Sequence, residues 1–339
     1  MWRRLTKWLD GRMPTPMMVA EAASEGQGKP FRVEVRSFAI ACMVIGGLAQ
    51  LAMILVISLI YTLGGALFLM ITTGGPFSFT FDLVWLAMDT NSGPHSQIIT
   101  LFANSGTIIT VLIYSRVTSQ RSFASLGYRR HGLTSEYAVG LGVGALLFAS
   151  AVGICLLTGS IEFISMSPQI VWGLILMFFL GYLVQGMSEE LVCRGYFITS
   201  FAHRLGMSVA ILLSSALFSF MHFLNPNVTL LALFNLLLFG VFAAVYFVKR
   251  GDIWGVAAIH SAWNFVQGNV LGIPVSGMTP YATIFELRLM EQGGLVNGGA
   301  FGLEGGLAVT FVLVVATVLM LFSKSRNVAP VDSVSQESA

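Results

Sequence analysis

Residues 168–194 read PQIVWGLILMFFLGYLVQGMSEELVCR, an apolar run that ends with two adjacent carboxylates, Glu189 and Glu190, and with Arg194. About 20 consecutive apolar residues are enough to cross a membrane as a helix. Charged side chains against such a segment are costly and usually mark a functional site. This stretch therefore predicts a transmembrane helix that carries a polar site.

The whole chain has the composition of a membrane protein. Of its 339 residues, 55% are hydrophobic and 10% are charged, whereas about a quarter of the residues in soluble domains are charged. Apolar runs long enough to span a membrane occur at 37–73, 98–116, 135–158, 168–188, 207–224, 228–248, 253–271 and 300–323. The sequence thus predicts an all-α, polytopic membrane helical bundle of about eight transmembrane helices.

The basic residues predict the orientation of this bundle. They gather before residue 37, in the loop 117–134, and directly after the sixth and eighth apolar runs, which all lie on one side of the membrane if eight spans are right. The opposite loops contain one basic residue, Arg288. Because short cytoplasmic loops are enriched in Lys and Arg, both termini are expected in the cytoplasm. Compact loops and short tails favour a bacterial inner membrane.

The chain divides into three parts on this reading. Residues 1–36 form a basic leader and linker, residues 37–323 the transmembrane domain with its polar core at about 168–271, and residues 324–339 a disordered cytoplasmic tail. Trp2, Leu5 and Trp8 recur at roughly helical spacing among basic residues. They predict either a short helix on an anionic leaflet or a disordered basic tail.

The loops 74–97 and 272–299 and a glycine pattern in the third apolar run each predict a structural feature. The loop 74–97 is rich in aromatic residues and predicts contact with the outer interface, and the loop 272–299 predicts a cap over the bundle. For both, an ordinary connecting loop is the alternative. Gly140 and Gly144 form a G-x-x-x-G pattern, which favours close helix packing.

The carboxylates after the apolar run have different partners on a helix. Glu190 and Arg194 are i,i+4 neighbours with the acid on the N-terminal side, the more favourable order for an ion pair. Glu189 points about 100° away, so it has no local cation and is the freer group for general acid or base work. The alternative is that all three mark the cytoplasmic end of the helix.

Two further polar positions follow in the next apolar runs. Phe218 and His222, and then His260 and Asn264, each lie i,i+4 on one helical face. Taken singly, each predicts a structural histidine or a polar contact between helices. Taken together with Glu189, they can activate a water molecule and stabilise an oxyanion, or build a metal site with an open position.

The predicted spans place these residues at different depths. Glu189 falls near the cytoplasmic end of its span and His222 near the outer end of a short one. The two meet if the helix that carries Glu189 continues to about Phe201 and tilts. They also meet if the fifth span is shorter and re-entrant, which the turn at Pro226 allows.

The ordered triple of motifs resembles the CAAX-processing and bacteriocin-processing (CPBP) family of intramembrane proteases, which includes the Ras-converting CAAX endopeptidases. The matching residues are Glu189-Glu190-x-x-x-Arg194, Phe218-x-x-x-His222 and His260-x-x-x-Asn264. The resemblance implies an all-α membrane protease. Its catalytic residues would be Glu189, activating water with the help of His222, and His260 and Asn264, holding the oxyanion. Glu190, Arg194 and Phe218 would support them.

The same resemblance leaves metal use open, because the family has been described both as metalloproteases and as glutamate-dependent proteases. Glu189, His222 and His260 could supply the ligands of a catalytic zinc site, although Asn is a poor zinc ligand and H-E-x-x-H is absent. The expected substrate is a membrane-associated peptide or protein within the lipid bilayer. A non-catalytic immunity or scaffold protein of this fold, or an ion-coupled transporter, are the alternatives. Nothing indicates nucleic-acid binding or predicts the oligomeric state.

Overall fold

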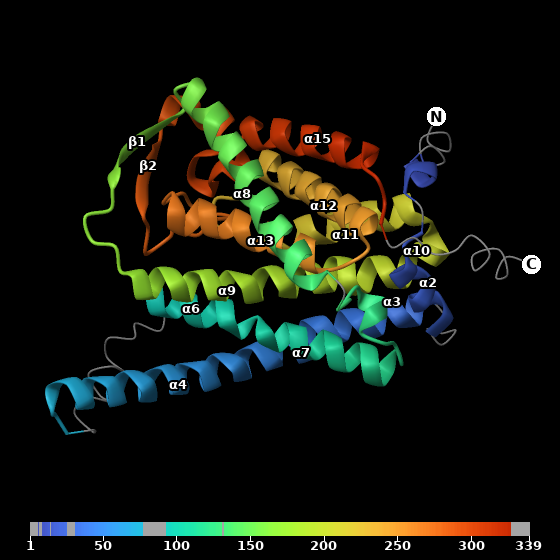
Figure 1. Cartoon of the computed structure of the whole chain (residues 1–339), viewed down its shortest axis with the longest axis horizontal. Coiled ribbons are helices and arrows are strands. Elements are labelled where there is room, and N and C mark those ends of the chain that lie inside the picture. Colours follow the sequence, from blue (N-terminus) through green and yellow to red (C-terminus); the bar gives the residue numbers. More distant parts are fainter. Residues whose placement is uncertain are drawn as a thin grey trace, which may run out of the picture.

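The chain folds as a bundle of long helices in the computed structural model (Figure 1). The structure describes residues 6, 9–13, 15–25, 31–76, 93–130 and 132–326. The predicted N-terminal helix around Trp2 to Trp8, the aromatic part of the 74–97 loop, and the C-terminal tail from Asn327 lie outside the described residues.

Helices account for nearly all the regular structure of the described residues. In the first half of the chain they are α2 (Met17–Glu25), α3 (Phe31–Ile40), α4 (Gly47–Thr73), α6 (Pro94–Ala103), α7 (Ser105–Ile113) and α8 (Leu133–Leu157). In the second half they are α9 (Trp172–Glu190), α10 (Thr199–Leu205), α11 (Met207–Met221), α12 (Leu230–Arg250), α13 (Trp254–Phe265), α14 (Gly294–Asn297) and α15 (Leu307–Phe322). Short π-helical stretches join or extend several of them, at Ala41–Gly46, Tyr114–Thr118, Leu191–Ile198 and Val266–Val270.

All eight predicted apolar runs coincide with helices. In the described part of the chain, five helical segments are long and apolar enough to cross a membrane: Arg32–Thr73, Pro94–Thr118, Leu133–Leu157, Trp172–Leu205 and Leu230–Arg250. The apolar helices α11 and α15 are shorter than a full span. The prediction of an all-α polytopic bundle is confirmed, and the chain is an integral membrane protein. Three of the eight runs, 207–224, 253–271 and 300–323, form shorter helices than the other five.

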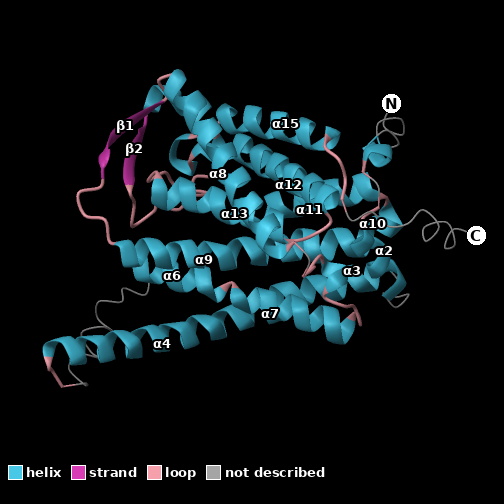
Figure 2. Cartoon of the chain, in the orientation of Figure 1, coloured by secondary structure: helices cyan, strands magenta, loops and turns pink. Residues whose placement is uncertain are grey.

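A small antiparallel sheet is the main feature that the sequence analysis missed. Strands β1 (Ile161–Met166) and β2 (Phe285–Leu289) pair at the end of the bundle opposite α2 and α10 (Figure 2). Arg288 lies across from Glu162 in the register and forms an exposed ion pair with it at 3.7 Å. The segment 272–299, predicted as a cap or a connecting loop, therefore contains a strand.

The helix that carries His260 lies at the centre of the packing. Gly140 and Gly144 of α8 face Gly255 and Ile259 of α13, and a Cβ atom added at Gly144 would lie 2.9 Å from the Cα atom of Ile259. The close packing that the G-x-x-x-G pattern predicted is confirmed. α13 also packs against α9, which brings the third motif beside the first. α11, which carries the second motif, packs against the stretch Leu191–Ile198 that continues α9.

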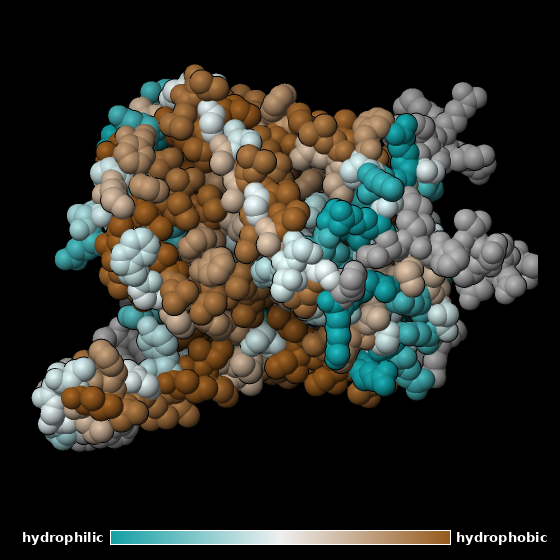
Figure 3. All heavy atoms as spheres, in the orientation of Figure 1, coloured by the Kyte–Doolittle hydropathy of each residue, from teal (hydrophilic) through white to brown (hydrophobic). Residues whose placement is uncertain are grey.

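Hydrophilic side chains gather at the end of the bundle formed by α2 and α10, whereas apolar side chains cover most of the visible middle (Figure 3). Ion pairs tie that end together: Arg129–Glu21 at 3.0 Å, Arg204–Glu34 at 3.0 Å, and Glu136 with both Arg250 and Arg326. We call it the basic end, defined by Arg121, Arg129, Arg204, Lys249, Arg250 and Arg326.

Candidate active site

The helix that carries the two carboxylates continues well past them. A π-helical stretch, Leu191–Ile198, joins α9 to α10 in one segment of 34 residues, Trp172–Leu205. Glu189 therefore lies near the middle of this segment. Placing it near the cytoplasmic end was wrong, because the apolar run stops at Ser188 but the helix does not. The continuation of the helix to about Phe201, one of the two alternatives that the sequence left open, is present.

The three motifs converge on the carboxylate of Glu189. Its Oε2 atom lies 3.8 Å from Nε2 of His222 and 3.8 Å from Nε2 of His260. Both distances exceed a direct hydrogen bond, and Oε2 is buried without a hydrogen-bond partner among the described residues. The distances suit a small group bound between the carboxylate and the two imidazole rings.

The hydrogen bonds behind the two histidines fix which ring nitrogens carry protons. Nδ1 of His222 lies 2.9 Å from the carbonyl oxygen of Phe218, and a carbonyl only accepts, so Nδ1 donates. Nδ1 of His260 lies 2.8 Å from Oε1 of Glu190 and donates to it in the same way. In a neutral imidazole the other nitrogen is then an acceptor. Two Nε2 atoms and one carboxylate oxygen therefore converge on the same small volume. The Nε2 atom of a neutral histidine accepts there, whereas that of a protonated histidine donates.

Glu190 is the structural member of the carboxylate pair. It is fully buried, and its Oε1 accepts hydrogen bonds from Arg194 at 3.0 Å and from His260 at 2.8 Å. Arg194 is also fully buried; it donates to the carbonyl oxygen of Gly240 and lies 4.8 Å from the ring centre of Phe218. The predicted Glu190–Arg194 pair is present, and the sequence analysis missed its contact with His260.

A glutamine that the sequence analysis did not single out connects Glu189 to Asn264. Gln185 Nε2 donates to Oε1 of Glu189, and Gln185 Oε1 accepts from Asn264 Nδ2 at 2.9 Å. The link orients the Glu189 carboxylate and leaves the second N–H of Asn264 for another acceptor. The available signal was the position of Gln185, one helical turn before Glu189.

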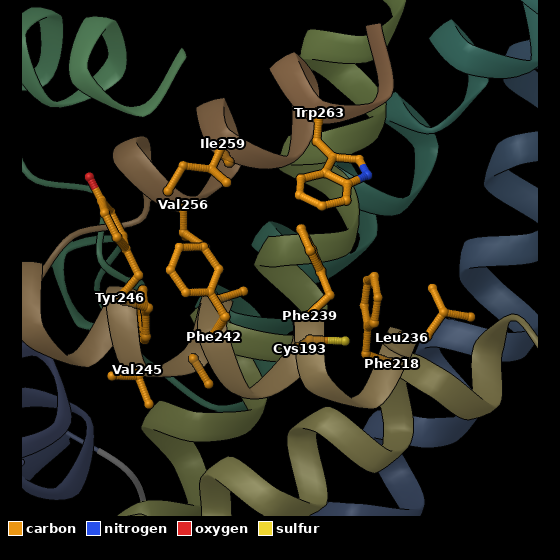
Figure 4. Close-up of a cluster of buried hydrophobic side chains, with 14 of the residues drawn as sticks. Cys193, Phe218, Leu236, Phe239, Phe242, Val245, Tyr246, Val256, Ile259 and Trp263 are labelled. Carbon is orange, nitrogen blue, oxygen red and sulfur yellow. The ribbon is translucent and has the colours of Figure 1, made fainter. Parts of the chain in front are cut away.

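Aromatic rings form the apolar wall behind the histidines. The ring of His260 lies 5.7 Å from that of Phe218 and 5.2 Å from that of Phe239. Phe239 also packs against Trp263 (Figure 4). Such contacts hold the imidazole in one orientation and exclude water from its face. Phe218 thus supports both His260 and, through its carbonyl, His222.

The site opens into a cavity of about 540 Å³, a size typical of ligand-binding sites. Its walls come from α6, α9, the end of α11 and the segment 275–281, and Glu189, His222 and Asn264 all line it. A small adjoining cavity is lined by His222, His260 and Asn264 and by a further carboxylate, Glu304.

Glu304 lies in the short segment before α15 and was not predicted from the sequence. Its Oε2 accepts from the backbone N–H of Ser276 at 2.6 Å and from the Ser276 hydroxyl at 2.9 Å. Burial raises the pKa of Glu304 above its ordinary value. These bonds hold Ser276, and with it one wall of the larger cavity, in place.

The donor types at the site match those of zinc proteins. Two imidazole nitrogens and one carboxylate oxygen form a chemically suitable set. However, the described part of the chain contains no group of three or more His, Cys, Asp or Glu side chains placed to hold a metal ion. We therefore derive no step through a metal.

A comparison with known protein families agrees with the position of the site. The family model described as type II CAAX prenyl endopeptidase Rce1-like matches residues 171–266, less than a third of the chain. The matched segment runs from the start of α9 to the end of α13 and contains every residue of the three motifs. It relates the chain to the CPBP family of CAAX-type proteases. No curated protein and no solved structure matches the chain.

Proposed function

We propose that this protein is an intramembrane endopeptidase that hydrolyses a peptide bond of a membrane-associated peptide or protein. The observation that carries the proposal is the convergence of Glu189, His222 and His260 beside a cavity that Glu189 and His222 line. CAAX-type proteases act on membrane-associated substrates, and the site here lies midway along a helix long enough to span the membrane.

In the proposed reaction Glu189 is the general base. A water molecule bound between Oε2 of Glu189 and the two Nε2 atoms gives its proton to the carboxylate and attacks the scissile carbonyl. Gln185 keeps the other carboxylate oxygen in place, so that Oε2 faces the water. His222, with its Nδ1 proton committed to Phe218, accepts the second hydrogen bond of the water through Nε2.

The oxyanion of the tetrahedral intermediate is stabilised by His260 and Asn264. When His260 is protonated, its Nε2 donates toward the developing charge, and Glu190 stabilises the imidazolium through Nδ1. The free N–H of Asn264 supplies the second donor. Glu189 then delivers its proton to the leaving amine, which completes hydrolysis without a covalent intermediate. This route uses no metal ion.

Cleavage of a quenched, membrane-anchored peptide library by purified protein tests the proposal. We expect the parent to cleave and Glu189→Gln to lose activity by about 10²–10⁴-fold, the usual contribution of general base catalysis. Glu286→Gln, which neutralises an exposed carboxylate on β2, is the matched control and should keep parent activity. Equal cleavage by the parent and Glu189→Gln would refute the assignment of the base, and no cleavage by the parent would favour a non-catalytic role.

A further inference from the structure

Glu304 belongs to a short segment that is fixed against the core of the bundle. It lies in the 3₁₀ turn Leu303–Gly305, directly before α15, and is 7% exposed. Asn235 of α12 donates through Nδ2 to the carbonyl oxygens of Glu304 and Gly306, both at 2.8 Å. The hydroxyl of Thr310 donates in turn to Oδ1 of Asn235 at 2.6 Å. Helix α12 and the first turn of α15 therefore determine where the Glu304 side chain can reach.

One oxygen of the Glu304 carboxylate is held by an unusual backbone conformation at Ser276. Ser276 has a φ of +47°, in the left-handed region that residues other than glycine rarely adopt and that often accompanies functional sites. In this conformation both its N–H and its hydroxyl donate to Oε2 of Glu304. Within the described part of the chain these are the two hydrogen bonds that the carboxylate receives, which leaves Oε1 available to the small cavity that Glu304 lines.

The small cavity beside Glu304 has room for one water molecule. Its volume is about 20 Å³, and a cavity of about 10–15 Å³ or more can hold a water molecule if several polar groups bind it. His222, His260 and Asn264 line the cavity together with Glu304. The larger cavity shares His222 and Asn264 with it, but Glu189 lines that cavity and Glu304 does not. The two carboxylates therefore approach the site from different cavities.

Charge also relates Glu304 to the histidines. Burial raises the pKa of Glu304, whereas the hydrogen bonds from Ser276 and the nearby His222 and His260 lower it. No Lys or Arg among the described residues forms an ion pair with it. The other titratable groups of the described chain that face Glu304 or the two histidines come from α9 and its continuation: Tyr182, Glu189, Glu190 and Arg194. A buried carboxylate needs donors or a positive charge nearby, and the imidazoles are the groups that can supply the charge.

We propose that Glu304 is a positioning residue of the hydrolytic site, which acts on His260 through one water molecule bound in the small cavity. The water donates one hydrogen bond to Oε1 of Glu304 and the other to Nε2 of His260, whose lone pair the attacking water does not use. The negative charge of Glu304 stabilises the positive charge that the proposed reaction places on His260 as the oxyanion forms.

This inference rests on the proposed function and adds a second carboxylate to it. Glu304 lies outside residues 171–266, the segment that the family model matches. The site then includes a group from the segment before α15, which none of the three motifs contains.

Steady-state cleavage of a quenched, membrane-anchored peptide by Glu304 variants separates charge from shape. Glu304→Gln keeps the length of the side chain and an oxygen that accepts from Ser276, but it removes the charge. We expect kcat to fall about 10–10²-fold with little change in KM, less than the loss of about 10²–10³-fold for a donor that contacts the oxyanion directly. Glu304→Asp keeps the charge and should retain more activity than Glu304→Gln.

Thr310→Val is the matched control for the structural part of this segment. It removes the hydrogen bond to Asn235 and so loosens the anchor of Glu304 without altering any charge. It should lower the thermal stability of the detergent-solubilised protein and keep the parent kcat. A purely structural role of Glu304 predicts the opposite order, with Glu304→Gln as active as the parent and Glu304→Asp impaired. That order would overturn the inference.

A second measurement does not depend on turnover. An experimental structure of the parent, at a resolution that shows ordered water, should contain one water molecule in the small cavity within hydrogen-bond distance of Glu304 and His260. A small cavity filled by side chains, or a Glu304 carboxylate that faces away from it, would overturn the inference even if the parent cleaves peptides. The water in place, in a parent that cleaves no peptide, would refute the proposed function and leave the contact between Glu304 and His260 standing.

Discussion

Replacing Glu190 by Gln separates the structural carboxylate from Glu189, the proposed general base. Both Glu190 and Arg194 have 0% side-chain exposure, and one oxygen of Glu190 accepts from Arg194 and from His260. Gln keeps the shape of the side chain but removes its charge, which leaves the Arg194 guanidinium buried without a counter-ion. Breaking a buried pair in this way costs about 3–5 kcal/mol.

The same substitution at the neighbouring position should cost far less. Glu189 has no cation within hydrogen-bond distance, and its one hydrogen bond comes from the neutral amide of Gln185. Glu189→Gln should therefore change the free energy of unfolding by no more than about 0.5–1.5 kcal/mol, the net value of one hydrogen bond. The two variants differ by one position and by nothing else in chemistry.

Denaturant unfolding in detergent micelles, followed by tryptophan fluorescence, measures the difference. A second change, Arg194→Met in the Glu190→Gln background, should recover part of the loss, because it removes the uncompensated charge. Equal destabilisation by Glu189→Gln and Glu190→Gln would refute the division of roles between the two carboxylates. So would a Glu190→Gln variant as stable as the parent.

Three further outcomes follow from the packing and the site. Gly144→Ala should lower the free energy of unfolding by about 1–3 kcal/mol, because the added methyl group overpacks against α13. Gly142→Ala is the control and should leave it unchanged, because nothing lies within 4 Å of the added Cβ atom. Equal unfolding curves for the two variants would contradict the close contact at Gly144. Asn264→Ala should reduce kcat by about 10²–10³-fold if its N–H serves the oxyanion, and a change in KM alone would argue against that role. Gln185→Leu should reduce kcat more than KM in the same peptide assay, because it releases Glu189 and Asn264 together; unchanged kcat would show that the link is dispensable.

The sequence was sufficient to predict the class of fold and to single out Glu189, His222 and His260, which the structure brings together. Apolar runs of span length predict helices wherever they occur, and all eight are helical. Pairs such as Glu190 with Arg194, and Phe218 with His222, lie one helical turn apart, so their relation depends only on local geometry. These features are encoded within short windows of the chain.

Contacts between distant segments were not predictable in the same way. The hydrogen bond from His260 to Glu190 joins residues 70 positions apart, and no periodicity relates them. The pairing of β1 with β2 is equally remote, because each strand lies in a connection that composition alone cannot distinguish from a loop. Glu304 was overlooked for the same reason: its role depends on Ser276, which it reaches only in the folded chain.

The depth of Glu189 shows how a correct pattern can mislead. The apolar run ends at Ser188, so hydropathy places a helix end there. The residues that follow, including Glu190, Arg194 and Tyr196, are polar or ionisable but buried among other helices. High hydropathy indicates that a helix contacts lipid. A helix that is surrounded by protein can continue through residues of low hydropathy.

The most direct test of the account is to measure peptide cleavage and bound metal in one detergent-solubilised preparation of the parent and of Glu189→Gln. The account predicts that the parent cleaves without stoichiometric metal and after chelation, and that folded Glu189→Gln does not cleave. The contradicting result is stoichiometric zinc in the parent, with both the zinc and peptide cleavage lost when His222 or His260 is mutated. Glu189 would then be a metal ligand and not the general base.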